Sequence, residues 1–212
     1  MHPAGIFSAE GPDATVISMV HRMPLGLLAL GLALVPGISA QKVANLDPAT
    51  IDNNFVQKQF GNSCTVNAAV PAVSGDLNGD GIEDIVIAAR CKDPMMDAAE
   101  NHYTVLDPFF AFYGFGDPKI TTQFSTADPD NRSLALLIIH GAGAEAWHAP
   151  EPKAKFLIVN LAYKQVNAKP LIVKKKPVMA IYVIESGEDQ MTSAMFFDGK
   201  KYKYQPMGSS ME

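Results

Sequence analysis

A chain of 212 residues is long enough to bury one hydrophobic core, or at most two small ones. Hydrophobic residues make up 48% of it and charged residues 18%, a composition typical of a globular protein and not of a disordered one. The net charge of −5 argues against a general nucleic-acid-binding protein, because neutralising phosphates requires a basic surface. Basic residues concentrate at 174–176 and again at Lys200, Lys201 and Lys203, and we interpret these runs as a solvated strand face or a protected sheet edge.

The first 40 residues follow the order of a secretory signal peptide. His21 and Arg22 precede an apolar run at 25–35, and Ile38-Ser39-Ala40 follow a Pro-Gly break and end in two small residues, although Ile38 is larger than is usual there. An apolar run of eleven residues is too short to span a bilayer as a helix. We therefore expect residues 1–40 to be a signal peptide with an upstream extension, cleaved after Ala40. The sequence predicts a secreted or periplasmic protein without a membrane span, with one globular domain at 41–212.

The chain has two cysteines, Cys64 and Cys91, and they flank an acidic stretch. In a secreted chain an even number of cysteines permits a disulfide. If the stretch between them joins two antiparallel strands, the two cysteines come close enough to pair. A Cys64–Cys91 disulfide is therefore expected, and two free buried thiols are the alternative.

The first element expected in the globular domain is a short helix. Asp47 is a candidate N-cap and Pro48 a first helical residue, while Gly61 is a natural stop. The residues that recur on one face at helical spacing are Ile51, Phe55, Val56, Gln59 and Phe60.

Strands and a second helical turn follow in the first half of the domain. We expect a strand at 65–74, and the unbroken apolar run at 85–89 is typical of a strand buried on both faces. A short strand is expected at 103–106, and Asp107-Pro108 then begins a helical turn. The aromatic residues that follow form either a plug at the end of a β core or a ligand platform: Phe109, Phe110, Phe112, Tyr113 and Phe115.

The second half of the domain is predicted to be mostly antiparallel β. The stretch 120–133 is polar and loop-rich, and Asp198-Gly199 is a hairpin turn signal. The fold class that results is mainly β or α+β, an antiparallel sheet domain with a short N-terminal helix. The strands expected in this half are 134–140, 155–160, 178–185, 192–197 and 201–204.

The acidic stretch of nine residues from 76 to 84 is the strongest chemical signal. Its oxygen-bearing side chains at Asp76, Asn78, Asp80 and Asp84 could surround a hard cation such as Ca²⁺, which takes several oxygen ligands. Ile87 stands where an EF-hand requires a bidentate glutamate, and it lies in a predicted strand. The sequence therefore predicts a strand–loop–strand site and excludes an EF-hand. An Asp/Asn turn without a metal is the alternative.

Residues 75–87, Gly-Asp-Leu-Asn-Gly-Asp-Gly-Ile-Glu-Asp-Ile-Val-Ile, resemble the FG-GAP and VCBS-type repeats of integrin α-chain propellers and many bacterial secreted proteins. The resemblance implies a calcium hairpin in which Asp76, Asn78, Asp80 and Asp84 supply side-chain oxygens and Ile82 a backbone oxygen. The motif occurs once, within about residues 65–91. We therefore expect a single blade-like calcium hairpin in place of a full propeller.

The function expected from these patterns is that of a secreted calcium-binding protein. Its calcium loop would be structural, and the domain would be a non-catalytic binding or interaction module for a protein or polysaccharide, not an enzyme. The alternative is a hydrolase that uses the loop His140-Gly141-Ala142-Gly143, because a strand ending in His-Gly-x-Gly resembles the oxyanion loop of α/β-hydrolases. The Gly-x-Ser-x-Gly elbow of that fold does not occur in the chain, which argues against this alternative.

Overall fold

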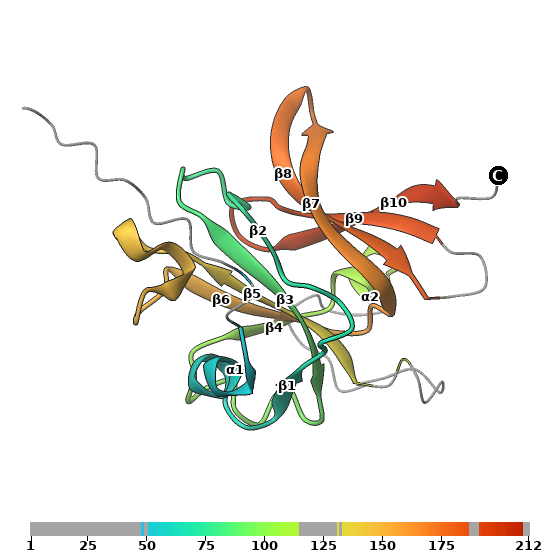
Figure 1. Cartoon of the computed structure of the whole chain (residues 1–212). Coiled ribbons are helices and arrows are strands. Elements are labelled where there is room, and N and C mark those ends of the chain that lie inside the picture. Colours follow the sequence, from blue (N-terminus) through green and yellow to red (C-terminus); the bar gives the residue numbers. More distant parts are fainter. Residues whose placement is uncertain (1–47, 49–50, 115–130, 132, 187–190, 210–212) are drawn as a thin grey trace, which may run out of the picture. The chain divides into compact units, whose positions relative to one another are not determined.

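Two β-sheets that share a hydrophobic core form the framework of the described part of the protein (Figure 1). The computed structural model describes residues 48, 51–114, 131, 133–186 and 191–209, all of which belong to the unit 41–212. The prediction of a mainly β, antiparallel-rich fold with few helices is confirmed. The predicted signal peptide lies outside the described residues, as does most of the polar loop predicted at 120–133.

The first sheet is antiparallel apart from one pair of strands. Within the described residues its six strands are β1 (Cys64–Val66), β2 (Val73–Gly75), β3 (Asp84–Cys91), β4 (Thr104–Leu106), β5 (Leu134–His140) and β6 (Ala154–Ile158). They are hydrogen-bonded in the order β1-β3-β5-β6-β4, and β2 also pairs with β3. The exceptional pair is β4–β6, which is parallel.

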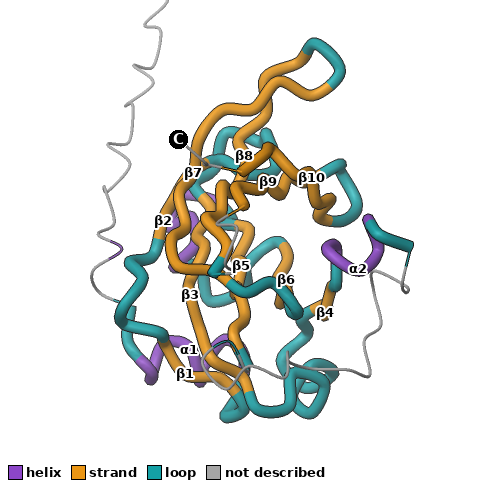
Figure 2. Tube along the Cα trace, turned by 90° about the vertical axis from the view of Figure 1, so that its right-hand side faces the viewer, coloured by secondary structure: helices purple, strands orange, loops and turns teal. Residues whose placement is uncertain are grey.

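The second sheet is an antiparallel meander in which each strand pairs with its neighbour in the sequence (Figure 2). Its strands are β7 (Tyr163–Val173), β8 (Lys176–Glu185), β9 (Met191–Phe197) and β10 (Tyr202–Ser209). The Asp198 N–H donates to the Lys201 carbonyl at 3.0 Å, which closes the β9–β10 turn predicted from Asp198-Gly199.

The helices are short, and their bounds are α1 (Asn53–Phe60), α2 (Pro108–Phe112) and the 3-10 segment η2 (Gly143–His148). The predicted N-cap of α1 was wrong: Asp52 caps it, because its carboxylate accepts the Phe55 N–H at 2.8 Å. Asp47, the residue predicted there, lies outside the described residues. Gly61 ends the helix as predicted, with a φ of 84°. No helix in the described part of the chain is long and apolar enough to cross a membrane.

Strands β3 and β5 lie inside the first sheet and are buried on both faces. Val86 and Ile138 join Ile181 of β8 in the core between the sheets. Ile87 and Leu137 point to the opposite face, where they form a second core with helix α1. Because successive side chains of a strand point to opposite faces, a strand covered on both sides needs an unbroken apolar run. The buried strand predicted from such a run is confirmed.

The strand predicted at 65–74 is interrupted by a turn. Its two ends form β1 and β2, which pair with different parts of β3. Between them the Val70 N–H donates to the Asn67 carbonyl at 3.1 Å, and Pro71 has no N–H to offer a strand ladder. The prediction of one continuous strand was therefore wrong.

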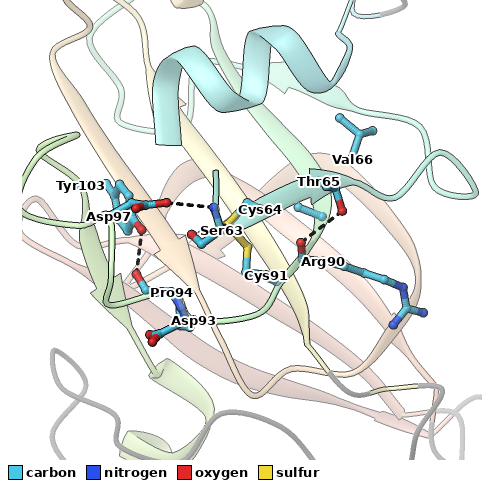
Figure 3. Close-up of a disulfide and its surroundings, with 12 residues drawn as sticks. Ser63, Cys64, Thr65, Val66, Arg90, Cys91, Asp93, Pro94, Asp97 and Tyr103 are labelled. Atoms are coloured by element: carbon cyan, nitrogen blue, oxygen red, sulfur yellow. Dashed lines mark hydrogen bonds between the residues drawn. A yellow bond between two sulfur atoms is a disulfide. The ribbon is translucent and has the colours of Figure 1, made fainter. Parts of the chain in front are cut away.

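A disulfide joins Cys64 of β1 to Cys91 of β3 (Figure 3). The two residues face each other in the register of these antiparallel strands. Next to them, the carboxylate of Asp97 accepts the Ser63 N–H at 2.8 Å. The disulfide predicted from the cysteine count is confirmed, and it fastens the chain that enters the β2–β3 hairpin to the strand that leaves it.

Strand β7 was missed by the sequence prediction, because Pro170 stands inside it and lysines interrupt its apolar pattern. Proline is tolerated there since β7 is an edge strand, whose outer N–H groups need no partner. Lys174 and Lys175 form the tight turn from β7 to β8, with φ angles of 49° and 67°. The lysine run predicted on a strand face or edge is therefore largely a hairpin tip.

Helix α2 begins where Asp107-Pro108 predicted it, and the Asp107 carboxylate accepts the N–H of the third helical residue at 3.0 Å. The aromatic residues around it separate into two groups. Phe109 packs against the core between the sheets. Phe112 and Tyr113 lie on the surface, where they are 52% and 47% exposed. Phe115 lies outside the described residues.

Candidate metal centre

The acidic loop joins β2 to β3, which pair antiparallel up to Gly75 and Asp84. Gly79 and Gly81 allow its tight curl, because their φ angles of 78° and 82° are strained for residues with a Cβ. The loop therefore has the strand–loop–strand geometry predicted from the sequence.

The carboxylate of Asp76 organises the first half of the loop. Its Oδ1 accepts the N–H groups of Gly79 and Asp80 at 2.8 and 3.0 Å, and its Oδ2 accepts that of Gly81 at 2.9 Å. Three donors on one carboxylate draw the backbone around the side chain. Asp76 thus faces the interior of the curl, as an ion ligand at this position must.

Asn78 and Asp80 each accept one N–H group of the loop. The Asn78 Oδ1 accepts the Asp80 N–H at 2.9 Å, and the Asp80 Oδ1 accepts the Ile82 N–H at 2.9 Å. Because the Asp80 N–H contacts oxygens of both Asp76 and Asn78, those two oxygens lie close together. The Nδ2 of Asn78 is buried and has no hydrogen-bond partner among the described residues.

A cation already lies beside the loop. The Lys153 Nζ is 2.7 Å from the Asp80 Oδ2, although the two residues are far apart in the sequence. The hydrogen bond from Lys153 lowers the pKa of Asp80, and Asp80 in turn raises the pKa of Lys153. Lys153 is placed there by its own backbone, since its N–H donates to the His140 carbonyl at 2.9 Å.

Asp84 has a different environment from the other three side chains. It is fully buried, and its carboxylate accepts the N–H groups of Leu77 and Gly141 at 2.8 Å each. Burial raises the pKa of Asp84 to about 7 in spite of these two hydrogen bonds. The carboxylate thereby holds the start of the loop and the end of β5 together. Its additional role as a metal ligand stays a prediction.

The donor set of the loop fits a hard cation better than a transition metal. Side-chain oxygens of Asp76, Asn78 and Asp80 accept N–H groups of the loop, and the carbonyl of Ile82 is the backbone oxygen predicted to join them. Among the described residues no three His, Cys, Asp or Glu side chains form a group that could hold a metal ion, and this holds for Asp76, Asp80 and Asp84 as the loop stands. Calcium accepts amide and backbone oxygens as well as carboxylates, and water completes its six to eight ligands, so this set suits Ca²⁺.

His140, the centre of the alternative hydrolase hypothesis, is part of the core. Its side chain is 2% exposed, and its Nε2 is hydrogen-bonded to the Tyr202 hydroxyl at 2.8 Å. The rings of Phe197 and Phe156 lie 4.8 and 5.1 Å from the imidazole, measured between centroids. A side chain enclosed in this way does not reach a substrate in solution. The geometry therefore lends no support to the hydrolase alternative.

The burial of His140 predicts a pH dependence of stability. Desolvation lowers its pKa to about 4 from an ordinary value near 6.5, so below about pH 6.5 the unfolded chain takes up a proton that the folded chain refuses. The free energy of unfolding therefore falls as the pH is lowered towards 4, and His140 accounts for about 2–3 kcal/mol of that loss. Urea unfolding of the wild type and of His140→Gln between pH 7 and 4.5 measures the effect.

The variant isolates His140 from other titrating groups. Asp84, with its raised pKa, has the opposite effect on stability over the same pH range, but it is present in both proteins. We expect the wild type to lose more stability than His140→Gln as the pH falls. Parallel pH profiles for the two proteins would contradict the neutral, buried state of His140.

Lys153 and Gly141 contribute to the loop and were not identified from the sequence. Gly141 allows a close approach, because a Cβ at this position would lie 2.3 Å from the Glu83 carbonyl oxygen. Both residues are separated from their partners in the loop by more than fifty positions in the sequence, and no local sequence pattern predicts such contacts. The His-Gly-x-Gly motif was noted in the sequence, but its first glycine, Gly141, packs against the acidic loop.

Comparisons of the chain with models of known protein families, with curated proteins and with solved structures gave no significant match.

Proposed function

We propose that the acidic loop binds one calcium ion, and that the ion fastens the β2–β3 hairpin of a non-catalytic, extracytoplasmic binding module. The observation that carries the proposal is that side-chain oxygens of Asp76, Asn78 and Asp80 all accept backbone N–H groups of the same short loop. The resemblance of residues 75–87 to FG-GAP and VCBS-type repeats points to the same ion.

Calcium would relieve an unfavourable concentration of charge. Asp76, Asp80 and Asp84 lie within one hairpin, and the charges of Asp76 and Asp80 each disfavour ionisation of buried Asp84. A divalent cation reverses that electrostatic penalty and draws the loop onto itself. In its absence the Lys153 ammonium group offsets part of the charge at Asp80.

The proposed location outside the cytoplasm has two supports. Residues 1–40 have the order of a signal peptide, and the Cys64–Cys91 disulfide is of a kind that persists in oxidising compartments. Calcium is also a ligand commonly used by extracellular modules, at weak affinities near 10⁻⁴–10⁻³ M. The partner of the module would be a protein or a polysaccharide.

The thermal stability of the protein tests the calcium site. Calcium at about 100 times its Kd should stabilise the protein by about 2.7 kcal/mol and raise its Tm by about 5–10 °C. EDTA should reverse this rise, and Asp80→Ala should abolish it because the variant lacks a central ligand. Differential scanning calorimetry with and without calcium measures all three.

Asp198→Ala is the matched control, because Asp198 also accepts backbone N–H groups in a hairpin turn, at 2.9 and 3.0 Å, but lies in the β9–β10 turn. It should keep the full response to calcium. Lys153→Gln should bind calcium more tightly than the wild type, since it removes a cation from Asp80. A wild-type melting curve unmoved by both calcium and EDTA would falsify the proposal.

A further inference from the structure

The β7–β8 hairpin extends beyond the rest of the second sheet (Figures 1 and 2). Its two strands remain paired as far as Val173 and Lys176, whereas β9 pairs with β8 only from Ala180 onwards. The tip beyond that point therefore lacks a third strand beside it. It carries Lys174 and Lys175 in the left-handed region, a conformation that asparagine and glycine adopt at lower energy.

A cleft lies between this tip, the β9–β10 hairpin and helix α2. Its volume is about 640 Å³, within the range of about 300–1,000 Å³ that is typical of small-molecule sites. Val178 and Phe196 line it from the outer face of the second sheet, the face turned away from the first sheet. The register supports this placement, because Met179 and Met195, which precede or follow them directly in their strands, pack into the core between the sheets.

An exposed aromatic side chain forms another wall of the cleft. Phe112 of α2 is 52% exposed, although its ring packs edge-on against Tyr204 with 5.4 Å between centroids. Large aromatic residues are enriched where proteins bind ligands, and apolar lining residues dominate small-molecule sites. The cleft thus offers an apolar surface held in place by the surrounding elements.

The charged residues at the cleft are mostly basic. Lys174, Lys176 and Lys203 line it together with one acidic residue, Asp198. The Lys203 Nζ lies 3.8 Å from the Asp198 carboxylate, but no ion pair joins Lys174 or Lys176 to another of the described residues. In a chain with a net charge of −5, this concentration of lysines favours an anion locally.

We propose that this cleft binds a small anionic amphiphile, an apolar chain or ring system that carries one carboxylate, sulfonate or phosphate group. The apolar part would lie against Val178, Phe196 and Phe112, and the anionic group would face Lys174, Lys176 and Lys203. A polyanion such as nucleic acid fits less well, because the cleft is mainly apolar and the protein as a whole repels it. The proposal does not require the calcium site.

Two fluorescent probes with the same ring system test the need for an anionic group. 1-Anilinonaphthalene-8-sulfonate carries a sulfonate, whereas N-phenyl-1-naphthylamine is uncharged. We expect the sulfonate to saturate a single site and to bind at least about tenfold more tightly than the uncharged probe. Decanoate should displace it and decyltrimethylammonium should not. Titrations of the sulfonate probe in EDTA should give the same Kd as titrations without it. The test of the cleft is therefore independent of whether the acidic loop binds calcium.

Charge-reversal variants locate the site. Lys174→Glu/Lys176→Glu/Lys203→Glu should weaken binding of the sulfonate by at least about tenfold. Lys58→Glu/Lys92→Glu/Lys164→Glu changes the net charge equally at exposed lysines that do not line the cleft, and it should change the Kd by less than about twofold. Circular dichroism spectra confirm that both variants keep the fold.

A second pair of variants tests the apolar wall. Phe112→Ala should weaken binding by about threefold to tenfold, while Tyr113→Ala, at the next residue but not among those that line the cleft, should have little effect. Equal binding of both probes, or equal losses in the two lysine variants, would overturn the proposal. The proposal would also be overturned if the protein sedimented with phosphatidylglycerol vesicles while decanoate failed to displace the probe. That result would indicate binding to a lipid surface.

Discussion

Reduction of the Cys64–Cys91 disulfide is expected to lower the free energy of unfolding by about 3.5 kcal/mol. The bond closes a loop with a sequence separation of 27 residues, and a loop of this length restricts the unfolded chain by about that free energy in the chain-entropy model. For a domain of this size the loss corresponds to a fall in Tm of about 7–14 °C. Calorimetry of the wild type with and without a phosphine reductant measures it.

The variant Cys64→Ala/Cys91→Ala is the control for the reductant itself. Its Tm should be low and should not respond to the reductant, because it has no disulfide to lose. A wild-type Tm that is the same in the oxidised and the reduced protein, with reduction verified by thiol titration, would show that the bond contributes nothing to stability.

The second large effect is expected from Gly141→Ala, at about 3 kcal/mol of destabilisation, the upper part of the range for overpacking. The added Cβ would lie 2.3 Å from the Glu83 carbonyl oxygen, 2.6 Å from the Ala146 carbonyl carbon and 2.9 Å from the Trp147 nitrogen. All three are backbone atoms, so no side-chain rotation relieves the contact. Urea unfolding of the variant measures the loss.

Gly143→Ala is the matched control, because it makes the same change two residues along the chain, where nothing lies within 4 Å of the added Cβ. Its φ of 60° still makes alanine unfavourable, by about 1 kcal/mol. Gly141→Ala should also weaken calcium binding, since the Gly141 N–H holds the Asp84 carboxylate at 2.8 Å. Equal stabilities of the two variants would contradict the close approach at Gly141.

Several parts of this structure followed from local sequence patterns. The apolar run at 85–89 predicted a strand covered on both faces, because the pleat of a strand needs apolar residues at consecutive positions for that burial. Gly61 and Asp107 predicted helix ends, since their conformational and hydrogen-bonding preferences act within a few residues. The curl of the acidic loop is likewise a local property, in which Asp76 bonds to N–H groups of its own loop.

Other parts depended on residues distant in the sequence. Pro170 obscured strand β7, because its tolerance depends on the strand's position at the sheet edge. Helix α1 is capped by Asp52, and its Val56 and Phe60 pack in the core on one face of the first sheet. The cleft at the β7–β8 hairpin has no sequence signature, since three separate elements form it.

The sequence by itself determined the chemical nature of the acidic loop and its strand–loop–strand form, and it placed two cysteines where a disulfide was expected. These depend on side-chain type and short spacings. Only the tertiary structure decided that Asp84 is buried between two backbone N–H groups, that Lys153 lies beside Asp80, and that His140 belongs to the core. The physical reason is that burial and charge pairing depend on the neighbours that folding brings together. Those neighbours come from the residue after β5, the residue before β6, and strands β6, β9 and β10.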